Sequence, residues 1–114
     1  MARIGPMNVT DGNKTYQFVV YDLEGPEYNA PGVYIFSKGS PNAQGGNNHQ
    51  FLYIGQTDGL RDRLGPDHHK WNEALSHGMN YISVYVPYPI ESRSNIERIL
   101  VQHFKPPLND RLIR

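Results

Sequence analysis

The sequence predicts a small α+β domain, and two observations carry this prediction. Short runs rich in β-branched and aromatic residues are bounded by turn residues, as strands are. Between and after them lie segments whose apolar residues recur at helical spacing. In chain order these segments give strand, strand, helix, strand, helix. A chain of 114 residues with 38% hydrophobic residues suits one compact core.

The first two strands are expected to form an antiparallel hairpin. They are the runs 32–36 (GVYIF) and 51–55 (FLYIG). The stretch between them, 37–50, is rich in Gly, Asn, Ser and Pro, which predicts a loop. An earlier run, 16–21 (YQFVVY), has strand composition and precedes the turn-like segment 24–26. It predicts an extra N-terminal strand at the edge of the sheet.

Helical spacing begins after the second strand of the hairpin. The segment 58–64 begins a predicted helix, and Gly65-Pro66 should either end it as a short helix or kink a longer one, because proline disrupts a helix interior. A second helix is expected within 67–77, with Gly78 as its C-terminal stop.

The last strand and the last helix have the most regular patterns. The run 80–86 (NYISVYV) alternates apolar and polar positions, which predicts a strand with one face buried. The run 94–104 (SNIERILVQHF) has apolar residues at helical spacing, and Pro106-Pro107 ends it.

Composition excludes several classes of protein. The absence of cysteine excludes a disulfide framework, a thiolate nucleophile and a cysteine-rich zinc site. The first ten residues lack the features of a secretory signal, and no apolar run approaches the ~18 residues that span a bilayer. We therefore expect a cytoplasmic protein without a membrane partner. Because the formal net charge is zero, nucleic acid could be attracted only by a local basic cluster.

Two tyrosines are predicted to share one face of the sheet. The period of two places Tyr34 opposite Val33 and Ile35. It likewise places Tyr53 opposite Leu52 and Ile54. Ordinary aromatic residues of a β-sheet explain such a pair as well as a functional site does.

Glu97 lies within the apolar arc of the last predicted helix, where a carboxylate needs a partner. Two partners are consistent with the sequence. The run 94–97 (SNIE) fits a capping box, in which the glutamate returns to the backbone at the start of the helix. Alternatively, Glu97 binds a hard cation such as Mg²⁺.

A basic cluster follows the second strand. It is either a solvated helix face or a phosphate site, because an arginine fork can grip two phosphate oxygens. Zinc binding by the two adjacent histidines is not expected, since adjacent residues rarely point at one ion and no HExxH motif is present. The members of the cluster are Arg61, Arg63, His68, His69 and Lys70.

The order and spacing of these residues resemble the GIY-YIG nuclease superfamily. The run 32–34 (GVY) resembles the GIY element with Val for Ile, and 53–55 (YIG) matches the YIG element. Three single residues follow at matching positions: Arg63, Glu97 and Asn109.

The resemblance implies a three-stranded antiparallel sheet flanked by helices, with 31–114 as the catalytic domain and 1–30 as an N-terminal extension. Such domains occur in excision-repair and homing endonucleases. The implied activity is metal-dependent hydrolysis of phosphodiester bonds, with DNA as the expected substrate.

The resemblance also implies a role for each matched residue. Glu97 would hold Mg²⁺ or Mn²⁺, and Arg63 would steady the scissile phosphate. Tyr34 would orient or deprotonate the attacking water, with Tyr53 beside it, although a tyrosine of pKa ~10 is a poor base at neutral pH without help. Asn109 would buttress the site.

One position departs from the family pattern. The family often places a His or Tyr one helical turn after the arginine, but here Asp67 occupies that position and Gly65-Pro66 interrupts the turn. We expect His68, in preference to His69, to enter the site as a proton shuttle or phosphate contact. The residues expected to contact nucleic acid are Arg61, Arg63, His69 and Lys70.

The chain segments before and after the motifs are short, which bears on how the protein would recognise its substrate. About 30 residues precede the motifs and few follow Asn109, so we expect no separate recognition module. A homodimer or a targeting partner could supply specificity. The rival hypothesis from another class is a non-catalytic nucleic-acid-binding module on the same fold.

Overall fold

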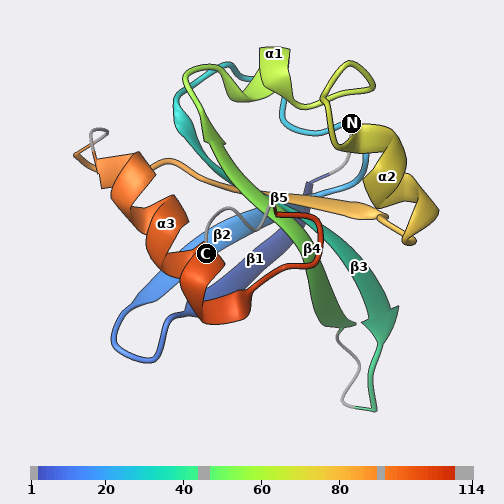
Figure 1. Ribbon diagram of the computed structural model, residues 1–114, viewed down its shortest axis with the longest axis horizontal. Coiled ribbons are helices and arrows are strands. Elements are labelled where there is room, and N and C mark those ends of the chain that lie inside the picture. Colours follow the sequence, from blue (N-terminus) through green and yellow to red (C-terminus); the bar gives the residue numbers. More distant parts are fainter. Residues whose placement is uncertain (1–2, 44–46, 90–91, 110–114) are drawn as a thin grey trace.

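The computed structural model describes residues 3–43, 47–89 and 92–109 (Figure 1). Within these ranges the chain forms a five-stranded antiparallel sheet with three helices. The strands are β1 (Arg3–Thr10), β2 (Thr15–Tyr21), β3 (Gly32–Pro41), β4 (Asn47–Thr57) and β5 (Tyr81–Tyr85). The helices are α1 (Leu60–Arg63), α2 (Trp71–Ser76) and α3 (Arg93–Phe104). No described helix has both the length and the apolar character needed to cross a bilayer.

The sheet has the strand order β1-β2-β5-β3-β4, so the expectation of three strands is wrong. The predicted N-terminal strand is confirmed as β2, but it is not an edge strand, because β1 pairs along its outer side. The sequence pattern missed β1 because Gly5 and Pro6 interrupt it. Both residues are typical of edge strands and irregular pairing, and the register shifts between Arg3 and Gly5.

The β3–β4 hairpin extends far into the stretch predicted as a loop. β3 continues to Pro41 and β4 begins at Asn47, so most of 37–50 is strand. A side chain secures this polar part of the hairpin. The Asn80 amide accepts a hydrogen bond from the Gly39 N–H at 2.8 Å and donates one to the Gly39 carbonyl at 3.1 Å. Such tertiary hydrogen bonds are invisible to a local sequence pattern.

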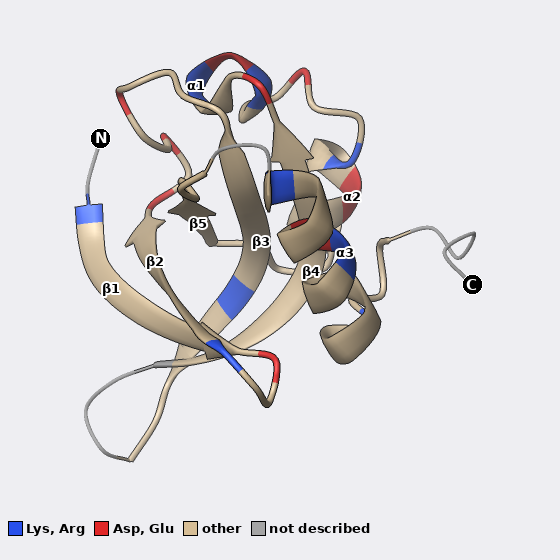
Figure 2. Cartoon of the chain, turned by 90° about the vertical axis from the view of Figure 1, so that its left-hand side faces the viewer, with Lys and Arg blue, Asp and Glu red and all other residues tan. Residues whose placement is uncertain are grey.

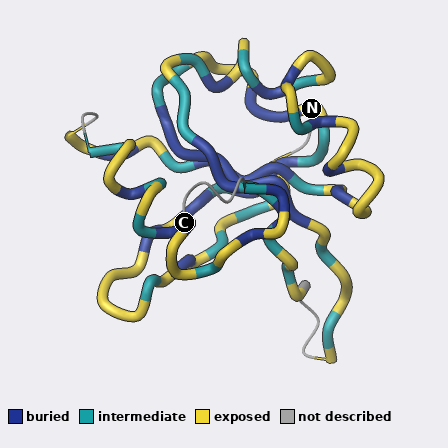
Figure 3. The backbone as a smooth tube through the Cα atoms, in the orientation of Figure 1, coloured by how far each residue is buried: buried dark blue, intermediate teal, exposed yellow. Residues whose placement is uncertain are grey.

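The sheet separates two apolar clusters, and Figure 3 shows the buried residues concentrated along its centre. We call the two sides the α1–α2 face and the α3 face. The α1–α2 face joins sheet residues to both short helices, and its members include Tyr34, Phe36, Val84, Leu60, Leu64, Trp71 and Ala74. The α3 face joins the other side of the sheet to α3, and its members include Val9, Tyr16, Phe18, Val33, Ile35, Ile54, Ile96, Leu100 and Val101. Residues of the N-terminal extension therefore share a core with β3 and β4.

A bulge in β4 changes one predicted side-chain direction. Phe36 pairs with Tyr53 but Ser37 pairs with Phe51, which leaves Leu52 as the extra residue. Leu52 consequently packs in the same cluster as Tyr34, whereas strict alternation predicted it on the side opposite Tyr53. The prediction that Tyr34 and Tyr53 share a face is confirmed, since their ring centroids are 6.2 Å apart.

The helices follow the sequence expectations with shifted boundaries. The short helix before Gly65-Pro66 is confirmed as α1, and α3 ends where the two prolines predicted. Turns occupy 64–70, so α2 begins only at Trp71. The chain after α3 returns to the outer edge of β4, where the Leu108 N–H donates to the Leu52 carbonyl at 2.9 Å.

Candidate functional site

Tyr34 lies across Gly55 of the neighbouring strand, and this close approach defines the site. Tyr34 is 1% exposed and pairs with Gly55 in the β3–β4 ladder. A Cβ atom at position 55 would lie 2.5 Å from the Tyr34 hydroxyl oxygen and 3.0 Å from the Tyr53 ring. Glycine is thus required by the two tyrosines rather than by a special backbone angle.

The loop after α1 brings His68 onto Tyr34. The loop is shaped by backbone hydrogen bonds from the His68 N–H to Gly65 O and from the Trp71 N–H to His68 O. The His68 side chain, 4% exposed, places Nε2 2.7 Å from the Tyr34 hydroxyl oxygen. Four rings surround the imidazole at centroid distances of 4.6 to 5.5 Å: Tyr34, Phe36, Tyr53 and His69.

The hydrogen bonds of His68 determine its tautomer. The Lys70 backbone N–H donates to His68 Nδ1 at 2.9 Å, so Nδ1 is an acceptor and carries no proton. In the neutral ring, Nε2 then carries the proton and donates it to the Tyr34 oxygen. The Tyr34 hydroxyl keeps its own proton for another acceptor.

Burial sets the protonation states of this pair. It lowers the pKa of His68 to about 3, with further lowering from Arg63 and then His69, so the ring is neutral at physiological pH. Burial, reinforced by Tyr53, raises the pKa of Tyr34 well above the ordinary value, and Arg63 offsets only part of that rise. At neutral pH Tyr34 is therefore a hydrogen-bond donor and not a phenolate base.

Arg63 joins this cluster from α1. Its Nη2 donates to His69 Nδ1 at 2.8 Å, and the His69 ring stacks on His68 with an interplanar angle of 17°. Tyr34, Tyr53, Arg63, His68 and His69 are thus brought together.

The other two predicted basic contacts carry nearby carboxylates. Exposed Arg61 lies 3.5 Å from Asp62, and half-buried Lys70 lies 3.4 Å from Glu73. Figure 2 shows the same alternation of basic and acidic residues around α1. These neighbours reduce the local positive charge, so a phosphate would depend most on Arg63.

An open cleft of about 400 Å³ adjoins Arg63 at the end of β4. It gives the arginine a solvent-facing side through which a ligand could approach. Its walls are formed by Asn29, Thr57, Asp58, Gly59, Asp62 and Arg63.

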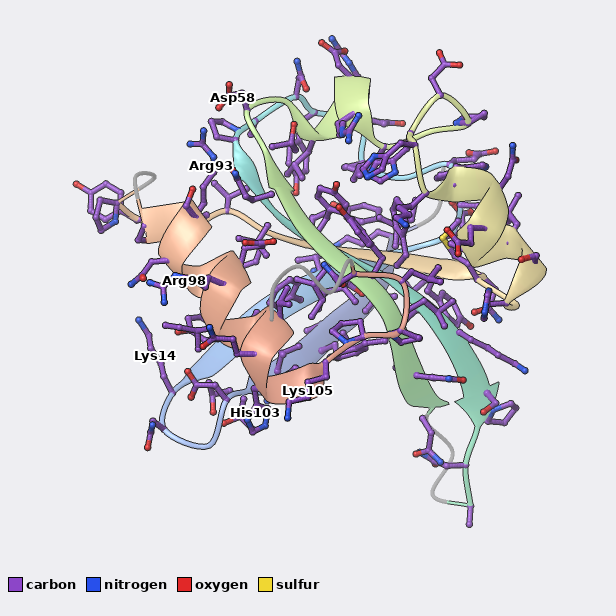
Figure 4. The ribbon with its side chains drawn as sticks, viewed as in Figure 1. Lys14, Asp58, Arg93, Arg98, His103 and Lys105 are labelled. Carbon is purple, nitrogen blue, oxygen red and sulfur yellow. The ribbon has the colours of Figure 1, made fainter. Side chains whose placement is uncertain are left out.

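Glu97 projects from α3, the helix on the opposite face of the sheet from Tyr34. Its helix begins near the end of β4, where Arg93 donates to Gln56 at 2.8 Å and forms an ion pair with Asp58 (Figure 4). Glu97 lies one turn further along, on the same side of the helix as Arg93 and buried Val101.

The carboxylate of Glu97 has no hydrogen-bond partner among the described residues. The capping-box hypothesis is wrong, because α3 begins at Arg93 after Ser92 and so Ser94 lies inside the helix. Burial raises the pKa of Glu97, an effect that Arg98 partly offsets. A half-buried carboxylate without a partner suits a hard cation, and Mg²⁺ is commonly held by one or two carboxylates plus waters and phosphate oxygens. The described residues contain no cluster of three or more His, Cys, Asp or Glu side chains that could hold a metal ion.

Asn109 holds the backbone of β4 rather than pointing at Tyr34. Its Oδ1 accepts from the Ile54 N–H at 2.9 Å, and its Nδ2 donates to the Ile54 carbonyl at 2.8 Å. This bidentate contact occupies the exposed edge of β4 between Tyr53 and Gly55. Asn109 therefore acts on the site through the strand.

Two residues of the site were missed by the sequence analysis. Phe36 packs against His68 with ring centroids 4.9 Å apart, and Trp71 packs against Phe36 at 5.7 Å. Phe36 lies two residues after Tyr34, so the period of two could have placed it on the same face. No comparable signal existed for Trp71, because its contact depends on the loop 64–70.

Comparison of the chain with protein family models, with curated proteins and with solved structures gave no match.

Proposed function

We propose that the chain is a divalent-metal-dependent nuclease of the GIY-YIG type that hydrolyses phosphodiester bonds, most naturally in DNA. The observation that carries the proposal is the Tyr34–His68 hydrogen bond beside Arg63. A neutral donor pair next to a guanidinium is suited to a phosphoryl group, whose oxygens accept hydrogen bonds and carry negative charge.

Tyr34 orients a water or a phosphate oxygen in this proposal. His68 donates to the Tyr34 oxygen, so the phenolic O–H can donate to a further acceptor, either Tyr53 or a ligand. Should Tyr34 lose its proton, the His68 N–H and the Arg63 charge would stabilise the phenolate. The raised pKa of Tyr34 makes the orienting role the principal one.

Arg63 stabilises charge on the phosphate, and His69 holds the guanidinium in place from the side. Arg61, His69 and Lys70 extend the contact along the nucleic-acid backbone. Because Arg61 and Lys70 have acidic neighbours, their contribution is smaller than that of Arg63.

Glu97 is the residue that would hold Mg²⁺ or Mn²⁺, since its half-buried carboxylate has no hydrogen-bond partner among the described residues. It lies one helical turn beyond Arg93, which contacts Gln56 at the end of β4. When bound, the cation supplies Lewis-acid stabilisation of phosphate charge and lowers the pKa of a bound water. Asn109 supports the site indirectly by holding β4 beside Gly55.

Cleavage of supercoiled plasmid and of labelled single-stranded, flap and duplex DNA and RNA tests the proposal. The reactions contain Mg²⁺ or Mn²⁺, with EDTA as the blank. We expect metal-dependent cleavage that falls at least about 100-fold in Arg63→Ala and in Glu97→Gln.

Two matched variants control for charge. Arg3→Ala removes an exposed arginine from β1, at the opposite edge of the sheet from β4. Glu27→Gln neutralises an exposed carboxylate in the segment between β2 and β3. Both should keep full activity. Binding of nucleic acid without cleavage would instead support the non-catalytic binding module. If the folded chain neither bound nor cleaved nucleic acid, both hypotheses would be wrong.

A further inference from the structure

A second cavity, of about 300 Å³, lies between β1 and the outer part of the β3–β4 hairpin. Strong twist brings these opposite ends of the sheet together, and Figure 1 shows β1 and β2 crossing the hairpin at a steep angle. Four strands contribute its walls, which comprise Ile4, Gly5, Pro6, Met7, Val20, His49 and Tyr81. None of these residues belongs to the proposed nuclease site.

The cavity is lined by apolar and neutral polar side chains and carries no fixed charge. Ile4, Pro6, Met7 and Val20 provide aliphatic walls, and no Lys, Arg, Asp or Glu lines it. Burial lowers the pKa of His49, which keeps the imidazole neutral at physiological pH. A phosphate or a carboxylate would find no counter-charge here, so a ligand must be neutral.

Two aromatic side chains place unpartnered polar atoms at this cavity. His49 and Tyr81 pack with ring centroids 5.3 Å apart, and His49 Nδ1 hydrogen-bonds Ser37 Oγ at 3.1 Å. The other ring nitrogen of His49 and the Tyr81 hydroxyl have no hydrogen-bond partner among the described residues. The Tyr81 ring lies over Gly39, where a Cβ would come within 2.4 Å of it, so this position of the ring requires glycine at 39.

A third polar atom lies next to the cavity wall. Ser83 is fully buried, and its Oγ is the one buried side-chain polar atom without a partner in the described part of the chain. Ser83 is two residues after Tyr81 and pairs with Val20, so its side chain shares a sheet face with both wall residues. Burying a hydroxyl without a partner costs about 1–3 kcal/mol. Ser83 itself is not one of the residues that line the cavity, so the polar atoms that a ligand there would meet are those of His49 and Tyr81.

We propose that this cavity binds an unpaired nucleobase. A base is small, neutral and planar, and it combines an aromatic face for Tyr81 and His49 with an edge that hydrogen-bonds neutral polar atoms. The volume is at the small end for ligand pockets, which suits a single base better than a larger ligand. The proposal rests on the proposed function only in that the base would belong to the nucleic acid presented to the nuclease site.

Titration with free nucleosides tests the cavity without the nuclease site, because nucleosides lack a phosphate. Binding of adenosine, guanosine, cytidine and thymidine is followed by amide chemical shifts, with inorganic phosphate as a separate titrant. We expect saturable binding of at least one nucleoside, with the largest shifts at Met7, Val20 and Tyr81, and no such shifts with phosphate.

Variants locate the binding. Tyr81→Ala should weaken nucleoside binding about tenfold through lost stacking, whereas Tyr88→Ala, which removes a ring that is 96% exposed, should not. Tyr81→Phe, which keeps the ring and the fold, should weaken binding a few-fold through loss of the hydroxyl. Arg63→Ala should leave it unchanged, because Arg63 is not part of this cavity.

Absence of saturable binding to any nucleoside would overturn the proposal, as would equal affinities of the native chain, Tyr81→Ala and Tyr81→Phe. Nucleoside binding without cleavage of nucleic acid would support the base-binding cavity and contradict the proposed nuclease activity. Cleavage without nucleoside binding would support the nuclease activity and contradict the base-binding cavity.

Discussion

The two faces of the sheet differ in whether their buried polar atoms have hydrogen-bond partners. On the α1–α2 face, both nitrogens of buried His68 have partners, supplied by the Tyr34 hydroxyl and the Lys70 backbone. On the α3 face, the buried Ser83 hydroxyl has no hydrogen-bond partner among the described residues. A buried polar group of this sheet can therefore be satisfied by the chain itself or left without a partner, and the two cases should respond differently to substitution.

Loss of the aromatic packing around His68 should lower the stability of the fold most. Phe36→Ala removes a fully buried ring that packs against Tyr34, Tyr53, His68 and Trp71, so we expect the free energy of unfolding to fall by about 3–5 kcal/mol. Chemical denaturation measures the loss. Tyr88→Ala, at an exposed ring, should change stability by less than about 0.5 kcal/mol. Equal losses in the two variants would contradict the packing described here.

The buried neutral state of His68 should make stability depend on pH. The unfolded chain binds a proton at His68 near pH ~6.5, whereas the folded chain does so only near pH 3. The folded state is therefore favoured fully above pH ~6.5 and loses roughly 1.4 kcal/mol for each pH unit below it. Chemical denaturation between pH 7 and pH 4 gives the free energy of unfolding of the native chain and of His68→Gln. Its dependence on pH should be flatter in the variant. Parallel curves would mean that His68 is accessible to protons.

The contact between Tyr34 and Gly55 should tolerate no side chain. Gly55→Ala places a methyl group 2.5 Å from the Tyr34 oxygen, so we expect a loss of about 1–3 kcal/mol and a displaced tyrosine. Gly65→Ala is the matched control, because a Cβ there meets nothing within 4 Å. Thermal unfolding compares the two, and a larger loss at position 65 would contradict the geometry.

Two serines of the α3 face should respond with opposite signs. Ser37→Ala removes the hydrogen bond to His49 Nδ1, so a loss of about 1 kcal/mol is expected. Ser83→Ala removes a buried hydroxyl without a partner, so stability should be unchanged or rise by up to about 1 kcal/mol. Chemical denaturation of both variants provides the measurement. A loss at Ser83 as large as that at Ser37 would show that the Ser83 hydroxyl is satisfied in solution.

Much of the fold followed from local patterns, and the exceptions have physical causes. The strands at 16–21 and 80–86 and the helix over 94–104 were predicted, because periodicities of 2 and 3.6 are properties of the backbone. β1 and the outer half of the hairpin were missed. Their residues lack an apolar pattern and are ordered by pairing and by the Asn80 amide.

The candidate site shows the same division. That Tyr34 and Tyr53 share a face was predictable from alternation, and the Gly65-Pro66 bend raised the possibility that a histidine enters the site. The choice of His68 was a preference, and the structure now places His68 on Tyr34 and His69 on Arg63. The position of Glu97 in the apolar arc followed from helical spacing, but its lack of a capping partner depended on the N-cap being Ser92, two residues before the Ser94 that the capping box requires.

By itself the sequence determined which segments alternate apolar and polar residues as strands, which segments form helices, and where prolines and glycines interrupt them. These features depend on neighbours in the chain. Only the tertiary structure decided that β5 inserts between β2 and β3, which nitrogen of His68 meets Tyr34, and that Ser83 is buried without a partner. Each of these depends on residues far apart in sequence. Their contacts exist only after the strands have paired and twisted and the helices have packed on both faces of the sheet.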